Sequence, residues 1–187
     1  MSSTNRGRER VLDDFYETPY WTTQLLHNYL GYIDEPILEP AVGKGKIVDV
    51  LKENGYKNIT GLDLNSKFNP DICEDYLSWV PDKEYKTIIT NPPYTFAAEY
   101  VHKCLEDVAE GGMVALLLRL NFLESKKRYP FWKEHMPSRI YVLAERPKFY
   151  LGKTDSIAYA WYVWFKDAMY ENEETTLTII SKQDLES

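Results

Sequence analysis

The sequence predicts an α/β fold built on a doubly wound, mostly parallel sheet. Apolar stretches of strand type alternate with amphipathic stretches of helix type through most of the chain, a pattern typical of a parallel sheet with helices on both faces. The 187 residues and the 44% hydrophobic content suit one domain with a full core. Polar motifs follow several of the expected strands, and sheets of this kind bind their ligands beyond the strands' carboxyl ends.

The helices and strands can be placed along the chain from their periodicity. Apolar residues at helical spacing predict a first helix over 18–30, with Thr18 as its N-cap and Pro19 in its first turn. Further helices are expected over 46–54 and 96–110, the second ended by Gly111-Gly112. Strands are predicted over 36–38, 59–64, 71–72, 86–90, 113–118, 139–143, 157–165 and, at a sheet edge, 175–180.

Composition bounds the domain organisation and the setting. We expect a flexible lead-in over residues 1–12, one domain over 13–167, and an acidic tail over 168–187. No apolar run is long enough for a membrane span, and the N-terminus lacks the apolar segment of a secretory signal. Cys73 and Cys104 form no metal-ligand pattern and no disulfide framework. These features favour a cytoplasmic protein that has no metal and no membrane partner.

Charge is distributed unevenly along the chain. The net charge is −7, yet the segment 119–153 contains nine Lys or Arg against three Glu, a local charge of +6. A basic stretch on an acidic body can face a polyanion, although it is also compatible with an ordinary solvated surface. Lys126, Lys127 and Arg128 are the candidate residues for contact with a nucleic acid.

The first motif is Glu39-Pro40-Ala41-Val42-Gly43-Lys44-Gly45, directly after the first strand. Two glycines allow the backbone to turn tightly and to approach a ligand closely, although a purely structural turn would also use them. A carboxylate beside such a turn pairs with a cationic amino group and repels a pyrophosphate. Glu39 therefore favours a ligand that carries an ammonium group over a dinucleotide.

The second motif is Asp63, at the end of the next strand and 20 residues beyond Gly43. At this spacing in α/β folds, a carboxylate accepts hydrogen bonds from the hydroxyls of a ribose. An N-cap or a surface aspartate is the simpler alternative.

The third motif, Asn91-Pro92-Pro93-Tyr94, follows the strand expected over 86–90 and is the most specific of the three. Two prolines stiffen the backbone and remove two N–H donors. The Asn91 side-chain carbonyl and a proline carbonyl can then accept hydrogen bonds from one NH2 group and raise the electron density on its nitrogen. Tyr94 offers a flat face on which a base or amide plane can stack.

In this order the motifs resemble those of class I S-adenosylmethionine (SAM)-dependent amino-methyltransferases, and most closely adenine-N6 DNA methyltransferases with an Asn-Pro-Pro-Tyr tetrapeptide. The resemblance extends from Phe15 to about Tyr94 and more loosely to Phe165. It implies a Rossmann-like, seven-stranded, mostly parallel sheet with an antiparallel strand near the C-terminus. It also implies SAM as cofactor, and methyl transfer to an exocyclic amino nitrogen, N6 of adenine in DNA.

The resemblance assigns a role to each motif. Thr18 and Pro19 would close over the methionine part of SAM, and Asp75 with Tyr76 would hold its adenine, with Asp71-Ile72 as the alternative placement. The catalytic residues would be Asn91, Pro92, Pro93 and Tyr94. The cofactor residues would be Thr18, Pro19, Glu39, Ala41, Gly43, Gly45, Asp63, Leu64, Asp75, Tyr76 and Asn91. Phe149 or Tyr150 would flank the target ring opposite Tyr94, unless both are core aromatics.

The sequence departs from this family by lacking room for a separate target-recognition domain. Specificity would then come from loops within 119–156, from a partner protein or from a homodimer. The tetrapeptide also occurs in enzymes that methylate adenine in RNA or the side-chain amide of glutamine in proteins. The basic segment favours nucleic acid, and DNA over RNA. A SAM-binding accessory subunit and a binding module without SAM are the alternatives from other classes.

Overall fold

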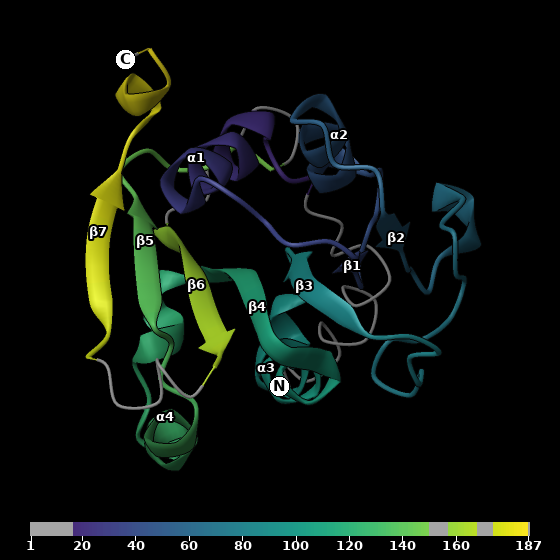
Figure 1. Ribbon diagram of the computed structural model, residues 1–187. Coiled ribbons are helices and arrows are strands. Elements are labelled where there is room, and N and C mark those ends of the chain that lie inside the picture. The colour runs from purple at the N-terminus through teal and green to yellow at the C-terminus, as the bar shows by residue number, and fades with distance from the viewer. Residues whose placement is uncertain (1–16, 150–156, 168–173, 187) are drawn as a thin grey trace, which may run out of the picture.

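The computed structural model describes residues 17–149, 157–167 and 174–186. Its centre is one seven-stranded sheet with the strand order β2-β1-β3-β4-β6-β5-β7 (Figure 1). The strands are β1 (Ile37–Glu39), β2 (Ile59–Gly61), β3 (Tyr85–Thr90), β4 (Val108–Arg119), β5 (Arg139–Leu143), β6 (Tyr159–Lys166) and β7 (Thr176–Ile180). Only β6 runs antiparallel to its neighbours, so the predicted mixed sheet and its late antiparallel strand are confirmed.

Helices cover both faces of the sheet. The four are α1 (Tyr20–Leu30), α2 (Lys46–Glu53), α3 (Ala97–Asp107) and α4 (Tyr129–Glu134). Figure 1 shows α1 and α2 on one side and α3 and α4 on the other. Each side has its own apolar cluster: Leu25 and Leu51 belong to the first, and Val101 and Trp132 to the second. The doubly wound arrangement therefore follows from two amphipathic helix pairs that each bury one stripe against the sheet.

Two local expectations were wrong. Thr18 is not the N-cap of α1, because Pro19 precedes the first helical residue and no side chain caps this end. The glycine pair Gly111-Gly112 does not end α3, because β4 already begins at Val108. These glycines lie inside β4 at an irregularity in its pairing with β3. A Cβ on Gly112 would meet the carbonyl oxygens of Ala109 and Lys86 at 2.7 Å, so the close backbone approach accounts for the glycine there.

The C-terminal segment adds the edge strand. β7 pairs in parallel with β5, and its Ile180 is completely buried on the α1 side. The predicted strand at 71–72 is reduced to one bridge between Leu62 and Ile72. Over residues 17–149, 157–167 and 174–186, no helix is long and apolar enough to cross a membrane.

Candidate active site

The functional candidates gather at one edge of the sheet. Glu39 is the last residue of β1, Asp63 follows β2, Asn91 follows β3 and Arg119 ends β4. These four strands are mutually parallel, so their carboxyl ends lie along the same edge. The topology therefore brings residues that are up to 80 positions apart in the sequence to the side of the sheet at which α/β proteins bind ligands.

The glycine loop after β1 has the backbone shape that its sequence predicts. Gly43 and Gly45 adopt φ angles of 49° and 75°, in the left-handed region that side chains disfavour. The Gly43 N–H donates to Asp63 Oδ2 at 2.8 Å, and Asn65 N–H donates to Asp63 Oδ1 at 2.8 Å. Asp63 therefore ties the end of β2 to the loop. Its assignment to a ribose stays a prediction.

Glu39 is the buried acid of the site. Its side chain is 2% exposed, and its Oε2 atom is buried with no hydrogen-bond partner among the described residues. Burial holds the pKa of this carboxyl well above its usual value, and the nearby charges of Asp63 and Asp49 raise it further. An ammonium group at Oε2 would supply the missing partner and favour the charged carboxylate. This unsatisfied acceptor fits the amino group of a methionine moiety.

Asn91 is held in one orientation by two side chains. Its Nδ2 donates to Thr18 Oγ1 at 3.1 Å, and its Oδ1 accepts a hydrogen bond from the Tyr94 hydroxyl at 2.7 Å. Thr18 is 6% exposed, so this contact is shielded from water. The side-chain carbonyl of Asn91 thereby faces Tyr94, and its role toward an exocyclic amine stays a prediction.

The prolines of the tetrapeptide differ in what their carbonyls do. The Pro93 carbonyl accepts the Phe96 N–H at 2.9 Å and closes the short turn that leads into α3. Pro92 is buried at the start of this turn. The role of a proline carbonyl toward a target amine stays a prediction.

An aromatic cluster surrounds Tyr94. The Tyr94 and Tyr159 ring centroids are 5.6 Å apart, and Phe149 packs edge-on against Tyr159 at 4.8 Å. Phe149 is 6% exposed, so it is a packed side chain near the site rather than an open platform. The other candidate for the second aromatic, Tyr150, lies outside the described residues.

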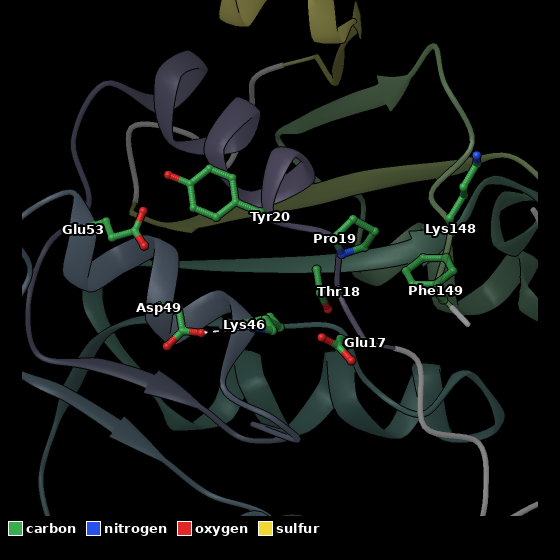
Figure 2. A pocket seen from close by; sticks show the side chains of 9 residues that line it. All are labelled: Glu17, Thr18, Pro19, Tyr20, Lys46, Asp49, Glu53, Lys148 and Phe149. Atoms are coloured by element: carbon green, nitrogen blue, oxygen red, sulfur yellow. Dashed lines mark ion pairs between the residues drawn. The ribbon is translucent and has the colours of Figure 1, made fainter. Parts of the chain in front are cut away.

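A pocket of about 430 Å³ opens beside this cluster, between the start of α1 with the segment before it and the length of α2 (Figure 2). In Figure 2, Glu17, Thr18 and Pro19 lie between the side chains of α2 on the left and those of Lys148 and Phe149 on the right. Its lining does not include Glu39, Asp63 or Asn91. Two predicted cofactor residues, Thr18 and Pro19, therefore line the pocket, whereas the cofactor residues at the ends of β1, β2 and β3 lie outside its lining.

An ion pair joins the two segments predicted to hold the cofactor. Lys44 Nζ of the glycine loop lies 3.0 Å from Glu17 Oε2, just before Thr18. The side chains are 55% and 34% exposed, and exposed pairs of this kind contribute between nothing and about 1 kcal/mol. The pair therefore adds little to the stability of the fold.

The predicted adenine-binding pair is divided between surface and core. Asp75 is exposed and its Oδ1 accepts the Leu77 N–H at 3.1 Å, whereas Tyr76 is 1% exposed and packs on Tyr100. Tyr76 therefore lies beneath this edge and presents no open ring face. Asp71, the alternative, accepts the Gly61 N–H through Oδ2 at 2.7 Å. The role of Asp75 toward adenine stays a prediction.

Two smaller candidates occupy different surroundings. Ala41 is half-buried against the apolar cluster on the α3 side of the sheet. Leu64 is 70% exposed, one residue beyond Asp63. An apolar side chain this open is available to a ligand at the edge of the sheet.

The three basic candidates are not equivalent. Lys126 and Lys127 are exposed. Arg128 instead donates from Nε to the Phe122 carbonyl at 2.8 Å and from Nη2 to the carbonyls of Asn121 and Glu124. Its guanidinium also stacks over the Phe122 ring. Arg128 therefore holds the loop after β4 together, and the two lysines are the cations left for an outside anion.

Arg119 and Tyr159 lie against the Tyr94 ring, although sequence reasoning did not single them out. They face each other as the pair at the end of β4 and the start of β6. The Arg119 guanidinium lies over the Tyr94 ring, 4.8 Å from its centroid, and Arg119 Nε donates to the Tyr159 hydroxyl at 3.5 Å. Only the position of Arg119 at the carboxyl end of an apolar strand could have signalled it.

The chain is similar, in sequence or in fold, to known proteins. No family model matches the chain. A curated relative, the type II methyltransferase M.CvrRI of Paramecium bursaria Chlorella virus XZ-6E, is 27% identical over 150 residues. The match covers 64% of this chain and 39% of the relative, so the chain spans about two fifths of that protein's length.

Solved structures share the fold at low identity. A Listeria monocytogenes protein assigned to the class I SAM-dependent methyltransferases superposes with a TM-score of 0.66 and 14% identity, over 88% of this chain and 65% of its own. The M protein of the type I restriction enzyme EcoKI gives a TM-score of 0.65 and 15% identity, over 91% and 49%. The chain therefore has the class I SAM-dependent methyltransferase fold.

Proposed function

We propose that this chain is a SAM-dependent methyltransferase that methylates an exocyclic amino nitrogen, N6 of adenine in DNA. The observation that carries the proposal is the orientation of Asn91, whose Nδ2 is held by Thr18 and whose Oδ1 faces Tyr94. An acceptor fixed in this way beside an aromatic ring suits a planar ring with an NH2 group. The named relative is itself a methyltransferase.

The cofactor would lie along the carboxyl edge of β1 and β2. Glu39 would bind the ammonium group, and the positive-φ turn at Gly43 and Gly45 would let the backbone approach the ligand. Asp63 would bind the ribose with the capacity left by its two backbone contacts, and Asp75 the adenine. When bound there, SAM supplies an electrophilic methyl group.

The chain's own residues position the target and exclude water. Asn91 Oδ1 and the Pro92 carbonyl accept the two N–H bonds of the amine and direct its nitrogen toward the methyl carbon. Bound SAM would supply the methyl group, with its sulfur as the leaving group, to the nitrogen that these two acceptors hold. The amine then loses one proton to solvent, so no general base is needed before the attack.

A nucleic acid is the proposed polymer because cations are exposed in the segment after β4, and the restriction-modification proteins that share the fold favour DNA over RNA. Lys126 and Lys127 are open to solvent in the segment after β4, where they can neutralise backbone phosphates. Sequence specificity would come from the loops within 119–156, from a partner protein or from a second copy of the chain. Modification subunits of type I restriction enzymes are among the proteins that share the fold.

The test offers purified protein three acceptors in parallel: plasmid DNA free of N6-methyladenine, total RNA and a protein mixture. SAM with an isotopically labelled methyl group allows the modified product to be identified by mass spectrometry. We expect labelled N6-methyladenine in DNA, and none with Asn91→Ala. Label in RNA adenine or in protein glutamine instead would identify RNA or protein as the substrate. The absence of SAM binding in calorimetry would overturn the proposal.

A further inference from the structure

Two of the three groups that the target would contact, Asn91 Oδ1 and the Tyr94 ring, are engaged within the protein. The Tyr94 hydroxyl donates to Asn91 Oδ1 at 2.7 Å, the atom proposed to accept the target amine. The Arg119 guanidinium lies over the Tyr94 ring, 4.8 Å from its centroid, and this ring is proposed to stack on the target. In the free enzyme, the protein's own side chains therefore cover the Tyr94 ring and use one of the two acceptor positions of Asn91 Oδ1.

These side chains match the target in chemistry. A phenol hydroxyl donates to the Asn91 carbonyl as one N–H of an exocyclic amine would. A guanidinium is flat and delocalised, and it stacks on an aromatic face much as a purine does. The pair Arg119 and Tyr94 thus satisfies Asn91 and the ring in the way that a bound adenine would.

We propose that Arg119 is a positioning residue which, together with the Tyr94 hydroxyl, substitutes for the target base until the base displaces both. The inference rests on the proposed function, because it needs a planar amine as substrate. Displacement costs the enzyme two contacts that the target must replace. The apparent affinity for substrate is therefore lower than the site alone would give.

The exchange requires only side-chain movement. The Arg119 backbone is fixed, because Arg119 pairs with Tyr159 in the sheet and its carbonyl oxygen accepts the Tyr162 hydroxyl at 3.3 Å. The Arg119 side chain is half-buried and contacts the Tyr159 hydroxyl at 3.5 Å, so the edge of the sheet gives it a second partner when it leaves Tyr94. A side-chain rotation is fast relative to turnover and adds no slow step.

The test measures KM and kcat separately, with unmethylated plasmid DNA as substrate. Arg119→Met removes the stacked cation and keeps an unbranched side chain, so KM is expected to fall by about threefold to tenfold, with kcat changed less than twofold. Tyr94→Phe keeps the ring and removes the hydroxyl, and its KM is expected to fall by about twofold to tenfold. Because both contacts involve the same Tyr94 side chain, the double variant is expected to lower KM by less than the product of the two single-variant factors.

A matched control separates this role from charge alone. Lys126→Met removes an exposed cation from the same segment and is expected to raise KM. A raised KM in Arg119→Met would overturn the proposal, because Arg119 would then bind the polymer directly. A lowered kcat at constant KM would also overturn it, as would no change in either constant.

Folding and the proposed function are checked independently. SAM affinity measured by calorimetry is expected to stay within twofold in each variant, and Arg119→Gln replaces Arg119→Met if the latter does not fold. Wild-type protein that transfers no methyl group to any acceptor would defeat the proposed function. An active wild type whose Arg119→Met variant has a raised KM would defeat only this inference.

Discussion

Thr18 and Asn91 are 73 residues apart in the sequence, yet Asn91 Nδ2 donates to Thr18 Oγ1 at 3.1 Å. This contact joins the segment before α1 to the loop after β3. It fixes which end of the Asn91 amide faces Tyr94, because the nitrogen end is occupied by Thr18. The proposed catalytic acceptor is thus oriented by a residue of the segment predicted to cover the cofactor.

Replacing Thr18 by Val should therefore impair catalysis without breaking the fold. Val has a similar shape but no acceptor for Asn91 Nδ2, so the amide can turn its nitrogen toward the target. We expect kcat to fall by about tenfold, in keeping with the loss of one shielded hydrogen bond. Thr18→Ser keeps the oxygen and serves as the control, and single-turnover methylation measures the effect. Equal activity of the Val and Ser variants would contradict this role.

Glu39→Gln tests the buried acid through its pH dependence. The pKa of Glu39 in the folded protein is raised well above 4.5, so the folded state binds the proton more tightly than the unfolded state does. Wild-type stability should therefore fall relative to Glu39→Gln as pH rises above about 4.5. Thermal unfolding of both proteins across this range measures the difference. Parallel stability curves would contradict the raised pKa.

The same variant should alter cofactor binding. An ammonium group at Glu39 favours the carboxylate, so binding SAM should release a proton, and SAM affinity should rise with pH above the usual carboxyl range. Glu39→Gln should lose this pH dependence and weaken binding by about tenfold or more. Calorimetry in two buffers of different ionisation enthalpy measures the proton release. An unchanged release in the Gln variant would assign it to another group.

Gly61→Ala should disturb the glycine loop that follows β1. A Cβ on Gly61 would lie 2.9 Å from Val42 Cγ2, and Val42 belongs to the glycine loop. Relief of the clash must shift the Val42 side chain within this loop, so we expect a loss of stability of about 1–3 kcal/mol together with weaker SAM binding. Denaturant unfolding and calorimetry measure the two effects. Gly55→Ala is a control of backbone strain alone, since φ is 94° there and nothing lies within 4 Å.

Replacing Lys127 should affect DNA binding, whereas replacing Arg128 should affect the stability of the fold. Lys127→Ala removes an exposed cation and should reduce the slope of log affinity against log salt for DNA by about one per lost phosphate contact. Arg128→Ala removes donors to three backbone carbonyls and should destabilise the protein by about 2 kcal/mol. Filter binding at several salt concentrations and thermal unfolding distinguish them. A stable Arg128→Ala with a reduced salt slope would make Arg128 a DNA contact.

The fold was predictable because its signals are local. The apolar strands, the positive-φ turn at Gly43 and the strand that precedes Asn91 each follow from a few neighbouring residues. The site was only partly predictable, because its remaining members meet through tertiary structure. Arg119 and Tyr159 become neighbours only once β4 and β6 pair.

Other details depended on competition between partners that a sequence does not reveal. Thr18 was expected to cap a helix, but its hydroxyl binds Asn91 instead. Arg128 carries the same charge as its neighbours Lys126 and Lys127, yet backbone carbonyls of its own loop use its donors. Tyr76 directly follows Asp75, the predicted adenine ligand, but its side chain is buried in the core.

The central claim is tested most directly by expressing the chain in a host that lacks adenine methylation and quantifying modified nucleosides in its total DNA and RNA by mass spectrometry. The account predicts N6-methyladenine in DNA from cells with the wild-type chain, and none with Asn91→Ala at equal protein level. Unmodified DNA from cells that contain folded, SAM-binding wild-type protein would contradict it.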